Sequence, residues 1–180
     1  MKIHGTTKGG ALSHKDFGVA FGGAPPVSEE IYNFTAGTTV GTTNENIRGI
    51  GNKFQTGQDV IGQTVTKMSM WLKNLSGGTL TMGVYDATSL TRVFTFGTVT
   101  TTTSDFVEYT KENLDGHVLE VDQIIGFDVS GVYTVSHQRY NTGVGADPNV
   151  EAAYWATSSG PEWQVAGDHQ DNNMILWGYA

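Results

Sequence analysis

Runs in which apolar and polar residues alternate, separated by turns, are the feature that most limits what this chain can fold into. In residues 64–73 the apolar side chains fall at every second position from Met68 to Leu72, and residues 79–85 repeat the alternation. Successive side chains of a strand point to opposite faces of a sheet, so this spacing is typical of half-buried strands. The glycine-containing turn at residues 74–78 predicts that the two strands form a hairpin.

Further strands are expected at short intervals along the chain. The sequence holds 24 glycines, 24 threonines and only 16% charged residues, against about 25% in a typical globular protein. Threonine is β-branched and glycine interrupts regular elements, while strong helix formers are scarce, so a helical bundle is excluded. We expect these strands at residues 31–35, 46–55, 92–100, 104–110, 117–121, 124–129, 132–140, 150–157 and 172–179.

About ten short strands separated by Gly, Asn, Asp and Ser turns predict an all-β fold, an antiparallel β-sandwich of two packed sheets. A closed barrel is the alternative. Among sandwiches we favour a jelly roll over an immunoglobulin arrangement, because the chain lacks cysteine and the strand count is high.

The chain of 180 residues is long enough for one sizeable domain, which we place at residues 27–180. Residues 1–26 are rich in glycine, end in two prolines and hold few bulky apolar residues, so they cannot form a core alone. We interpret them as an extended docking arm anchored by Phe17 and Phe21. A disordered tail is the alternative.

Charge and hydropathy restrict the partners and the compartment. Residues 1–26 carry three lysines and one aspartate, for a charge of +2, whereas the rest of the chain carries −10. Nucleic acid is therefore an unfavourable ligand of the body. No apolar run approaches a membrane span, and no signal peptide is recognisable, so we expect synthesis and release in the cytoplasm.

One pair of carboxylates resembles part of a catalytic site. Jelly-roll glycosidases place carboxylates at alternate positions of one strand, and Glu120 and Asp122 match the first two. The third position falls on Ile124 or, with a bulge, on Ile125. Retaining hydrolysis needs a second catalytic carboxylate at this point, so we predict that the chain has no catalytic residues and is not an enzyme.

Signals for metals and cofactors are weak. The five histidines show no paired spacing, and no phosphate loop, dinucleotide fingerprint or nucleophile elbow occurs. We expect no cofactor. The alternative is calcium, for which Asp168, Asp171 and Asn173 offer clustered oxygen ligands.

Aromatic residues supply the more informative candidate sites. A flat aromatic face suits the C–H side of a sugar ring, and nearby amides and carboxylates suit its hydroxyls, but sandwich cores and interfaces use the same residues. Trp71 lies on the polar face of its expected strand and is the best single candidate for an exposed or interface aromatic. The candidate glycan or interface aromatics are Trp71, Tyr140, Tyr154, Trp155 and Trp163. The last four form a C-terminal group of aromatic residues that also contains Trp177.

Two stretches carry a resemblance. The strand, glycine turn and strand from Trp71 to Asp86, and the ending Asn173 to Tyr179, resemble jelly-roll modules related to carbohydrate-binding domains, which occur in glycan-active enzymes and in viral and phage appendages. The segment Gly9 to Gly22 is similar to the start of some phage and virus structural proteins. The resemblance implies a fold more than a function.

Three functions are compatible with these observations. The first is a structural protein of a virus or phage particle, made in the host cytoplasm, located in the virion and bound through its arm to copies of itself or to other particle proteins. The second is a carbohydrate-binding module that recognises surface glycans. The third and weakest is a glycoside-active enzyme. The missing signal peptide favours the first over the second.

Overall fold

A computed structural model describes residues 26–43, 47–75, 78–89, 91–100, 102–130, 134–141, 150–156, 163–165 and 170–180. Within these ranges the regular structure consists of β-strands, and no helix occurs. The strands are β1 Glu29–Phe34, β2 Thr39–Thr42, β3 Ile47–Phe54, β4 Thr64–Lys73, β5 Thr79–Tyr85, β6 Arg92–Val99, β7 Val107–Val118, β8 Ile124–Ser130, β9 Ser136–Asn141, β10 Val150–Ala156, β11 Trp163–Val165, β12 Gln170–Asn172 and β13 Met174–Tyr179.

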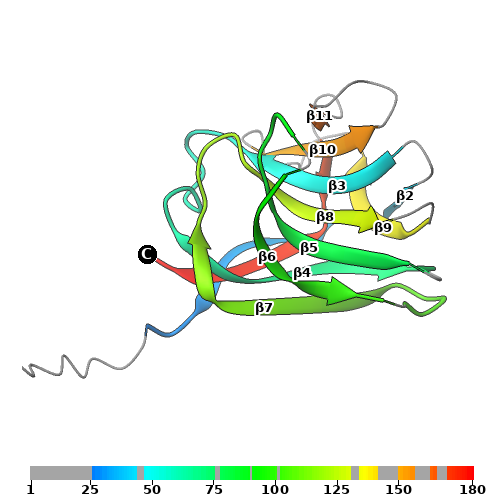
Figure 1. The fold of residues 1–180 in the computed structure, drawn as a ribbon, viewed down its shortest axis with the longest axis horizontal. Coiled ribbons are helices and arrows are strands. Elements are labelled where there is room, and N and C mark those ends of the chain that lie inside the picture. Colours follow the sequence, from blue (N-terminus) through cyan, green and yellow to red (C-terminus); the bar gives the residue numbers. More distant parts are fainter. Residues whose placement is uncertain are drawn as a thin grey trace, which may run out of the picture.

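Two antiparallel sheets pack face to face (Figure 1). Sheet A has seven strands in the order β1-β13-β4-β9-β12, with β7 beside β4 and β2 beside β9. Sheet B has six strands in the order β11-β10-β3-β8-β5-β6. The prediction of an antiparallel β-sandwich is confirmed, and the jelly-roll arrangement stays a prediction.

The core lies between the sheets and is built by the alternation seen in the sequence. Met68 and Leu72 of β4 are fully buried, as are Leu80 and Met82 of β5 and Phe127 of β8. These side chains belong to one continuous cluster that spans both layers. Burial of each such side chain contributes roughly 1.5 to 3 kcal/mol relative to exposure, so the period-2 pattern fixes which face of each strand points inward.

The predicted hairpin of residues 64–73 and 79–85 is wrong, although both strands have the expected bounds. β4 pairs with β13, β7 and β9 in sheet A, whereas β5 pairs with β6 and β8 in sheet B. The connection crosses between the layers, with Leu75 buried and the amide of Asn74 bonded to the carbonyl of Thr103 at 2.9 Å. The apolar faces of both strands contribute to the same core cluster between the sheets.

Other strand predictions differ in their segmentation. The expected strands 104–110 and 117–121 are replaced by the long strand β7, which has an irregular register opposite Val65 and Lys67, next to Gly116 at φ 63°. The expected strand 172–179 is interrupted at Asn173 into β12 and β13, and β2 and β11 were not predicted. A bulge and a strand of three or four residues leave little periodic signal, so alternation alone does not reveal them.

Residues 1–25, which include Phe17 and Phe21 of the expected arm, lie outside the described residues. The described chain begins at Pro26, and β1 runs antiparallel to β13 along the edge of sheet A. Both ends of the body therefore lie on one side of the molecule (Figure 1). Nowhere in the described ranges is there a helix long and apolar enough to cross a membrane.

Candidate functional site

The outward face of sheet A carries two tryptophans. Trp71 of β4 and Trp177 of β13 are half-buried and alternate with core residues, so their rings lie on the side away from sheet B. Trp177 is opposite Lys67 in the register, and Trp71 is four residues further along β4. At about 3.3 Å per residue, the two positions are roughly 13 Å apart along the strand. We call this surface, which also carries Ile175, the tryptophan face.

Charged residues accompany both aromatic positions. The ammonium group of Lys67 lies 4.3 Å from the ring centroid of Trp177, which is a cation–π contact. Glu112 of β7 is opposite Lys67, and Glu108 is opposite Trp71. The tryptophan face therefore combines flat apolar rings with carboxylates and the ammonium group of Lys67.

The residues between the two tryptophans are firmly held. Ser69 lies between the two aromatic positions on β4 and is fully buried. Its hydroxyl is 2.6 Å from that of Thr110 on β7. Ile175 is opposite Ser69 on the other side. Because β4 is hydrogen-bonded on both flanks, it presents Trp71 from a rigid strand rather than from a loop.

The remaining predicted aromatics do not join Trp71. Trp155 and Trp163 are opposite each other on β10 and β11, with ring centroids 6.1 Å apart. Tyr154 packs against the main core instead, since it is adjacent to Trp155 and faces the opposite side. Tyr140 pairs with Asp171 in the backbone register, and its side chain lies outside the described residues.

Trp155 and Trp163 belong to a second apolar cluster on the outer face of sheet B. Trp163 is only 7% exposed, and its ring centroid is 5.3 Å from that of Tyr85. The indole nitrogen of Trp163 donates to the carbonyl of Ser89 at 2.9 Å, and its backbone amide donates to the carbonyl of Ala87. The connection after β5 thus covers Trp163, which leaves little of its ring for a ligand.

Small residues beneath this second cluster make room for its rings. Gly51, Gly126 and Gly83 lie side by side in register across β3, β8 and β5. At Gly126 a Cβ atom would collide with the backbone of β3, so the close approach of the strands requires glycine. At Gly49 of β3 a Cβ atom would collide with the ring of Trp163, so this ring can lie close to the sheet only because the residue is glycine.

The candidate catalytic carboxylates lie in a turn rather than on a strand. Glu120 and Asp122 are exposed residues between β7 and β8, and Asp122 has φ 70°. The ammonium group of Lys53 lies 2.8 Å from the carboxylate of Asp122. Ile124 and Ile125 are buried in two different apolar clusters, on opposite faces of sheet B.

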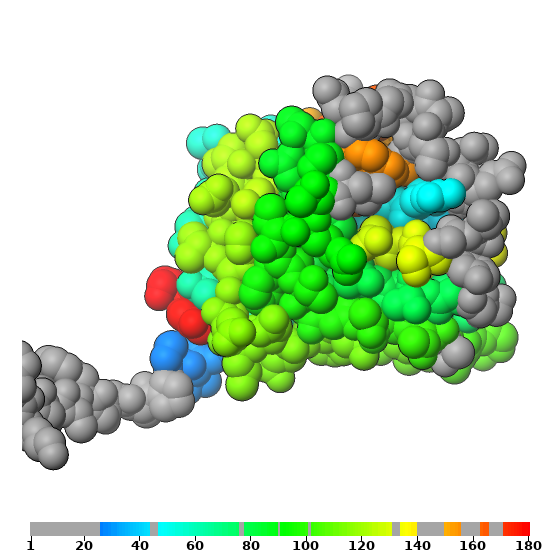
Figure 2. All heavy atoms as spheres, in the orientation of Figure 1, coloured from blue at the N-terminus to red at the C-terminus, as the bar shows by residue number. Residues whose placement is uncertain are grey.

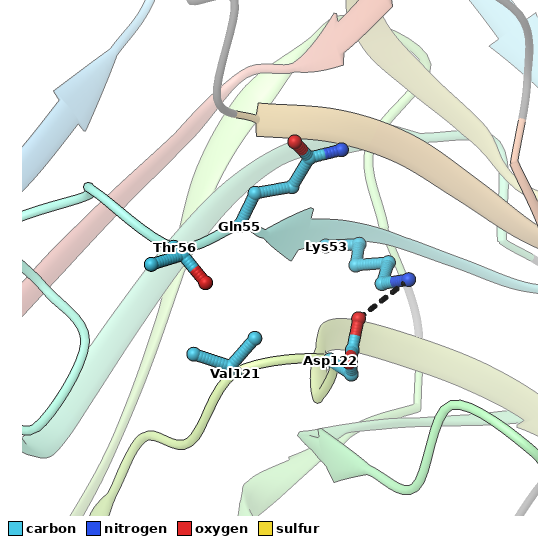
Figure 3. A pocket seen from close by; sticks show the side chains of 5 residues that line it. All are labelled: Lys53, Gln55, Thr56, Val121 and Asp122. Carbon is cyan, nitrogen blue, oxygen red and sulfur yellow. Dashed lines mark ion pairs between the residues drawn. The ribbon is translucent and has the colours of Figure 1, made fainter.

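A shallow pocket of about 250 Å³ adjoins this ion pair (Figure 3). Its lining consists of Lys53, Gln55, Thr56, Val121 and Asp122. Asp122 is the one carboxylate in that set. Glycoside hydrolysis uses a pair of carboxyl groups that flank the scissile bond, and these lining residues supply one carboxyl group.

The candidate calcium ligands are already engaged or lie outside the described ranges. The side-chain oxygen of Asn173 accepts from the amide of Gly37 at 2.9 Å, and its amide group donates to the carbonyl of Gly37 at 2.8 Å. Asp171 is fully buried in β12. Asp168 is not described. Over the described part of the chain, no group of three or more His, Asp or Glu residues could hold a metal ion.

His137 of β9 is a buried titratable residue that the sequence did not single out. Its ring is 2% exposed, and it lies edge to face against Phe127. Burial, together with the nearby charge of Arg139, lowers the pKa of His137 to about 3. Gly41 is opposite His137 in β2, and a Cβ there would collide with the imidazole ring. The sequence signal for this buried histidine is Gly41, and it can be recognised only after the pairing of β2 with β9 is known.

An apolar hollow of about 260 Å³ lies where the described chain begins. It is lined by Pro26, Ser28, Thr66, Leu114 and Tyr179, and these residues define what we call the apolar hollow. Figure 2 shows the N-terminal residues in blue, the C-terminal residues in red and the yellow-green end of β7 meeting at this corner.

Leu114 is the most unusual residue of the apolar hollow, because 76% of it is exposed. It lies on the irregular part of β7 just before Gly116, where no register partner on β4 is assigned. The apolar hollow could not be predicted from the sequence, since its lining residues come from four separate segments.

Comparisons with protein-family models, with curated proteins and with solved structures found no match for this chain.

Proposed function

We propose that this chain is a non-enzymatic structural component of a virus or phage particle, a capsid-associated, decoration or fibre-type protein. In this proposal the β-sandwich is the body, and residues 1–26 anchor it to copies of itself or to other particle proteins. The jelly-roll arrangement belongs to the same proposal, which places the protein in the virion.

The observation that carries the proposal is the apolar hollow at the foot of the N-terminal segment. Leu114 is 76% exposed there, beside the lining residues Pro26 and Tyr179. Scattered exposed apolar residues are ordinary, but apolar residues gathered around a hollow are typical of interaction sites. An assembly protein needs such a site, and its place beside Pro26 links it to the segment expected to dock.

The carboxylate arrangement supports the absence of catalysis in this proposal. Asp122 is paired with Lys53, and its pocket offers one carboxylate where hydrolysis uses two. On the outer faces of the sandwich, hydrogen bonds join neighbouring strands, and one tryptophan ring is covered. Such a rigid body suits a static building block.

The experiment compares the full chain with a variant that lacks residues 2–24. Sedimentation velocity should show the full chain as oligomers and the shortened chain as a monomer, with the same β-sheet circular dichroism. Antibodies against the body should also label intact particles purified from the source. Equal assembly of both proteins, or antibody signal confined to particle-free fractions, would contradict the proposal.

A second candidate function is glycan binding, which the tryptophan face favours. Trp71 and Trp177 lie about 13 Å apart on one open sheet face with Glu108 and Lys67 nearby, and sugars are bound by such combinations of rings and polar groups. Affinity electrophoresis in polysaccharide gels tests it. Retardation should be lost in Trp71→Ala and Trp177→Ala and kept in Trp155→Phe, which alters the other sheet.

A further inference from the structure

We infer that the apolar hollow of one copy receives Phe21 from the N-terminal segment of a second copy, so that copies exchange their arms. The inference rests on the proposed function, because it names the surface through which the assembly forms.

The size of the apolar hollow fits a side chain better than a small-molecule ligand. Its volume of about 260 Å³ is below the ~300 Å³ at which small-molecule pockets usually begin. Its walls are mostly apolar, with the ring of Tyr179 and the exposed side chain of Leu114. The hydroxyls of Ser28 and Thr66 are 2.9 Å apart and satisfy each other. An apolar anchor can enter without leaving these hydroxyls unpaired.

Net charge favours an encounter between the N-terminal segment and the body. Residues 1–25 carry Lys2, Lys8 and Lys15 against Asp16, a balance of +2, whereas residues 26–180 carry −10. Opposite charges attract the segment of one copy to the body of another.

The segment also contains suitable anchors within a short distance. Twenty-five residues precede Pro26, and Phe17 and Phe21 are the bulkiest apolar residues among them. Glycines at positions 18, 22 and 23 flank these rings, which lets the backbone approach a neighbouring surface closely. Few of the other residues in the segment could fill an apolar hollow.

The proposed assembly favours the hollow of a second copy over that of the same copy. An arm that bound the hollow of its own copy would join no two copies, whereas reciprocal exchange between two copies closes a symmetric pair.

The absence of cysteine allows a direct test by engineered cross-linking. Full-length Phe21→Cys and full-length Leu114→Cys are mixed and oxidised, and a disulfide forms only where the Cα atoms come within about 7 Å. We expect a cross-linked heterodimer on non-reducing gels at ten times or more the yield from Phe21→Cys mixed with Val93→Cys. Val93 is a matched control, since it is exposed on β6 of the other sheet.

The double variant Phe21→Cys/Leu114→Cys separates exchange from docking within one chain. Cross-linked dimers and larger species support the inference, whereas a cross-linked monomer of altered mobility overturns it. A mixture yield equal to that of the Val93→Cys control also overturns it.

A third variant distinguishes failure of this inference from failure of the proposed function. Full-length Leu114→Asp should lose assembly in sedimentation velocity, as the chain lacking residues 2–24 should. If Leu114→Asp assembles normally while the deletion does not, the arm docks elsewhere, and only the inference fails. If the deletion itself assembles normally, the proposed function fails as well.

Discussion

The hydroxyl of Tyr85 lies 2.5 Å from the carboxylate of Asp128, which joins β5 to β8 on the outer face of sheet B. The same hydroxyl is 2.8 Å from the carbonyl of Thr81, and the guanidinium of Arg92 lies 3.6 Å from the same carboxylate oxygen of Asp128. Burial and the charge of Asp128 raise the pKa of Tyr85 well above its usual value. The hydroxyl therefore stays protonated and donates to Asp128 over the working pH range.

Replacing this tyrosine tests the strength of the contact. Tyr85→Phe should lower the free energy of unfolding by about 1 to 3 kcal/mol, because a half-buried carboxylate loses its donor. Urea denaturation measures the change. Tyr179→Phe, at a half-buried position on β13, serves as the control and should change stability by less than about 0.5 kcal/mol. An equal loss in both variants would contradict this account.

His137 should make the fold sensitive to acid. The unfolded chain binds a proton near the ordinary pKa of 6.5, whereas the folded chain resists it until about pH 3, so unfolding gains protons between these values. Stability at neutral pH is unaffected by this group, and it falls as the pH drops from 6.5 toward 3, by roughly 4 to 5 kcal/mol over the window.

Removing the imidazole provides the test. His137→Leu should show a shallower dependence of unfolding free energy on pH between 6.5 and 4, whatever its stability at pH 8. Each protein is therefore compared with its own value at pH 8. Parallel curves for the two proteins would show that His137 does not carry the acid response.

Gly126 should tolerate no side chain. A Cβ at this position would collide with the carbonyl of Ile50 and with Gly51, both backbone, so strands β3 and β8 would have to separate. Gly126→Ala should cost about 1 to 3 kcal/mol or more by this overpacking. Gly97→Ala is the matched control, because its new Cβ would meet only the flexible side chain of Lys111. Thermal unfolding of both variants decides the comparison.

A screen of polysaccharides for hydrolysis tests the role of Glu120 and Asp122, the exposed carboxylates before β8. We expect no hydrolysis of any β-glucan, because Ile124 and Ile125 occupy the positions where a second catalytic carboxylate would be required. Reducing-sugar release is the measurement. Turnover that disappears in Glu120→Gln would overturn this expectation and restore the enzymatic alternative.

Strand positions could be predicted wherever alternation was strong. The bounds of β4 and β5 agree with the sequence prediction to the residue, because burial of one face is a local property of the pattern. Their pairing could not be predicted in the same way. The partners of β4 are β13, β7 and β9, and nothing in residues 64–85 indicates which distant segments supply them.

The candidate sites could be predicted only in part, because strand pairing decides which side chains share a face. Trp155 and Trp177 are close in sequence, yet β10 belongs to sheet B and β13 to sheet A, so the C-terminal aromatics are divided between faces. Trp163 is covered by a connection near Ser89 that is distant in sequence. Alternation did place Trp71 outward correctly, since its neighbours Leu72 and Met70 had to face the core.

The order of strands in the two sheets has a consequence for how the chain is made on the ribosome. β4 lies next to β13, and β3 lies between β8 and β10, so early strands must wait for late partners. Roughly 100 residues separate β4 from β13, which is about 5 to 20 s of synthesis at typical rates. During that interval the side of β4 that pairs with β13 stays open, and a nascent chain held by a chaperone would be protected from pairing with the wrong edge.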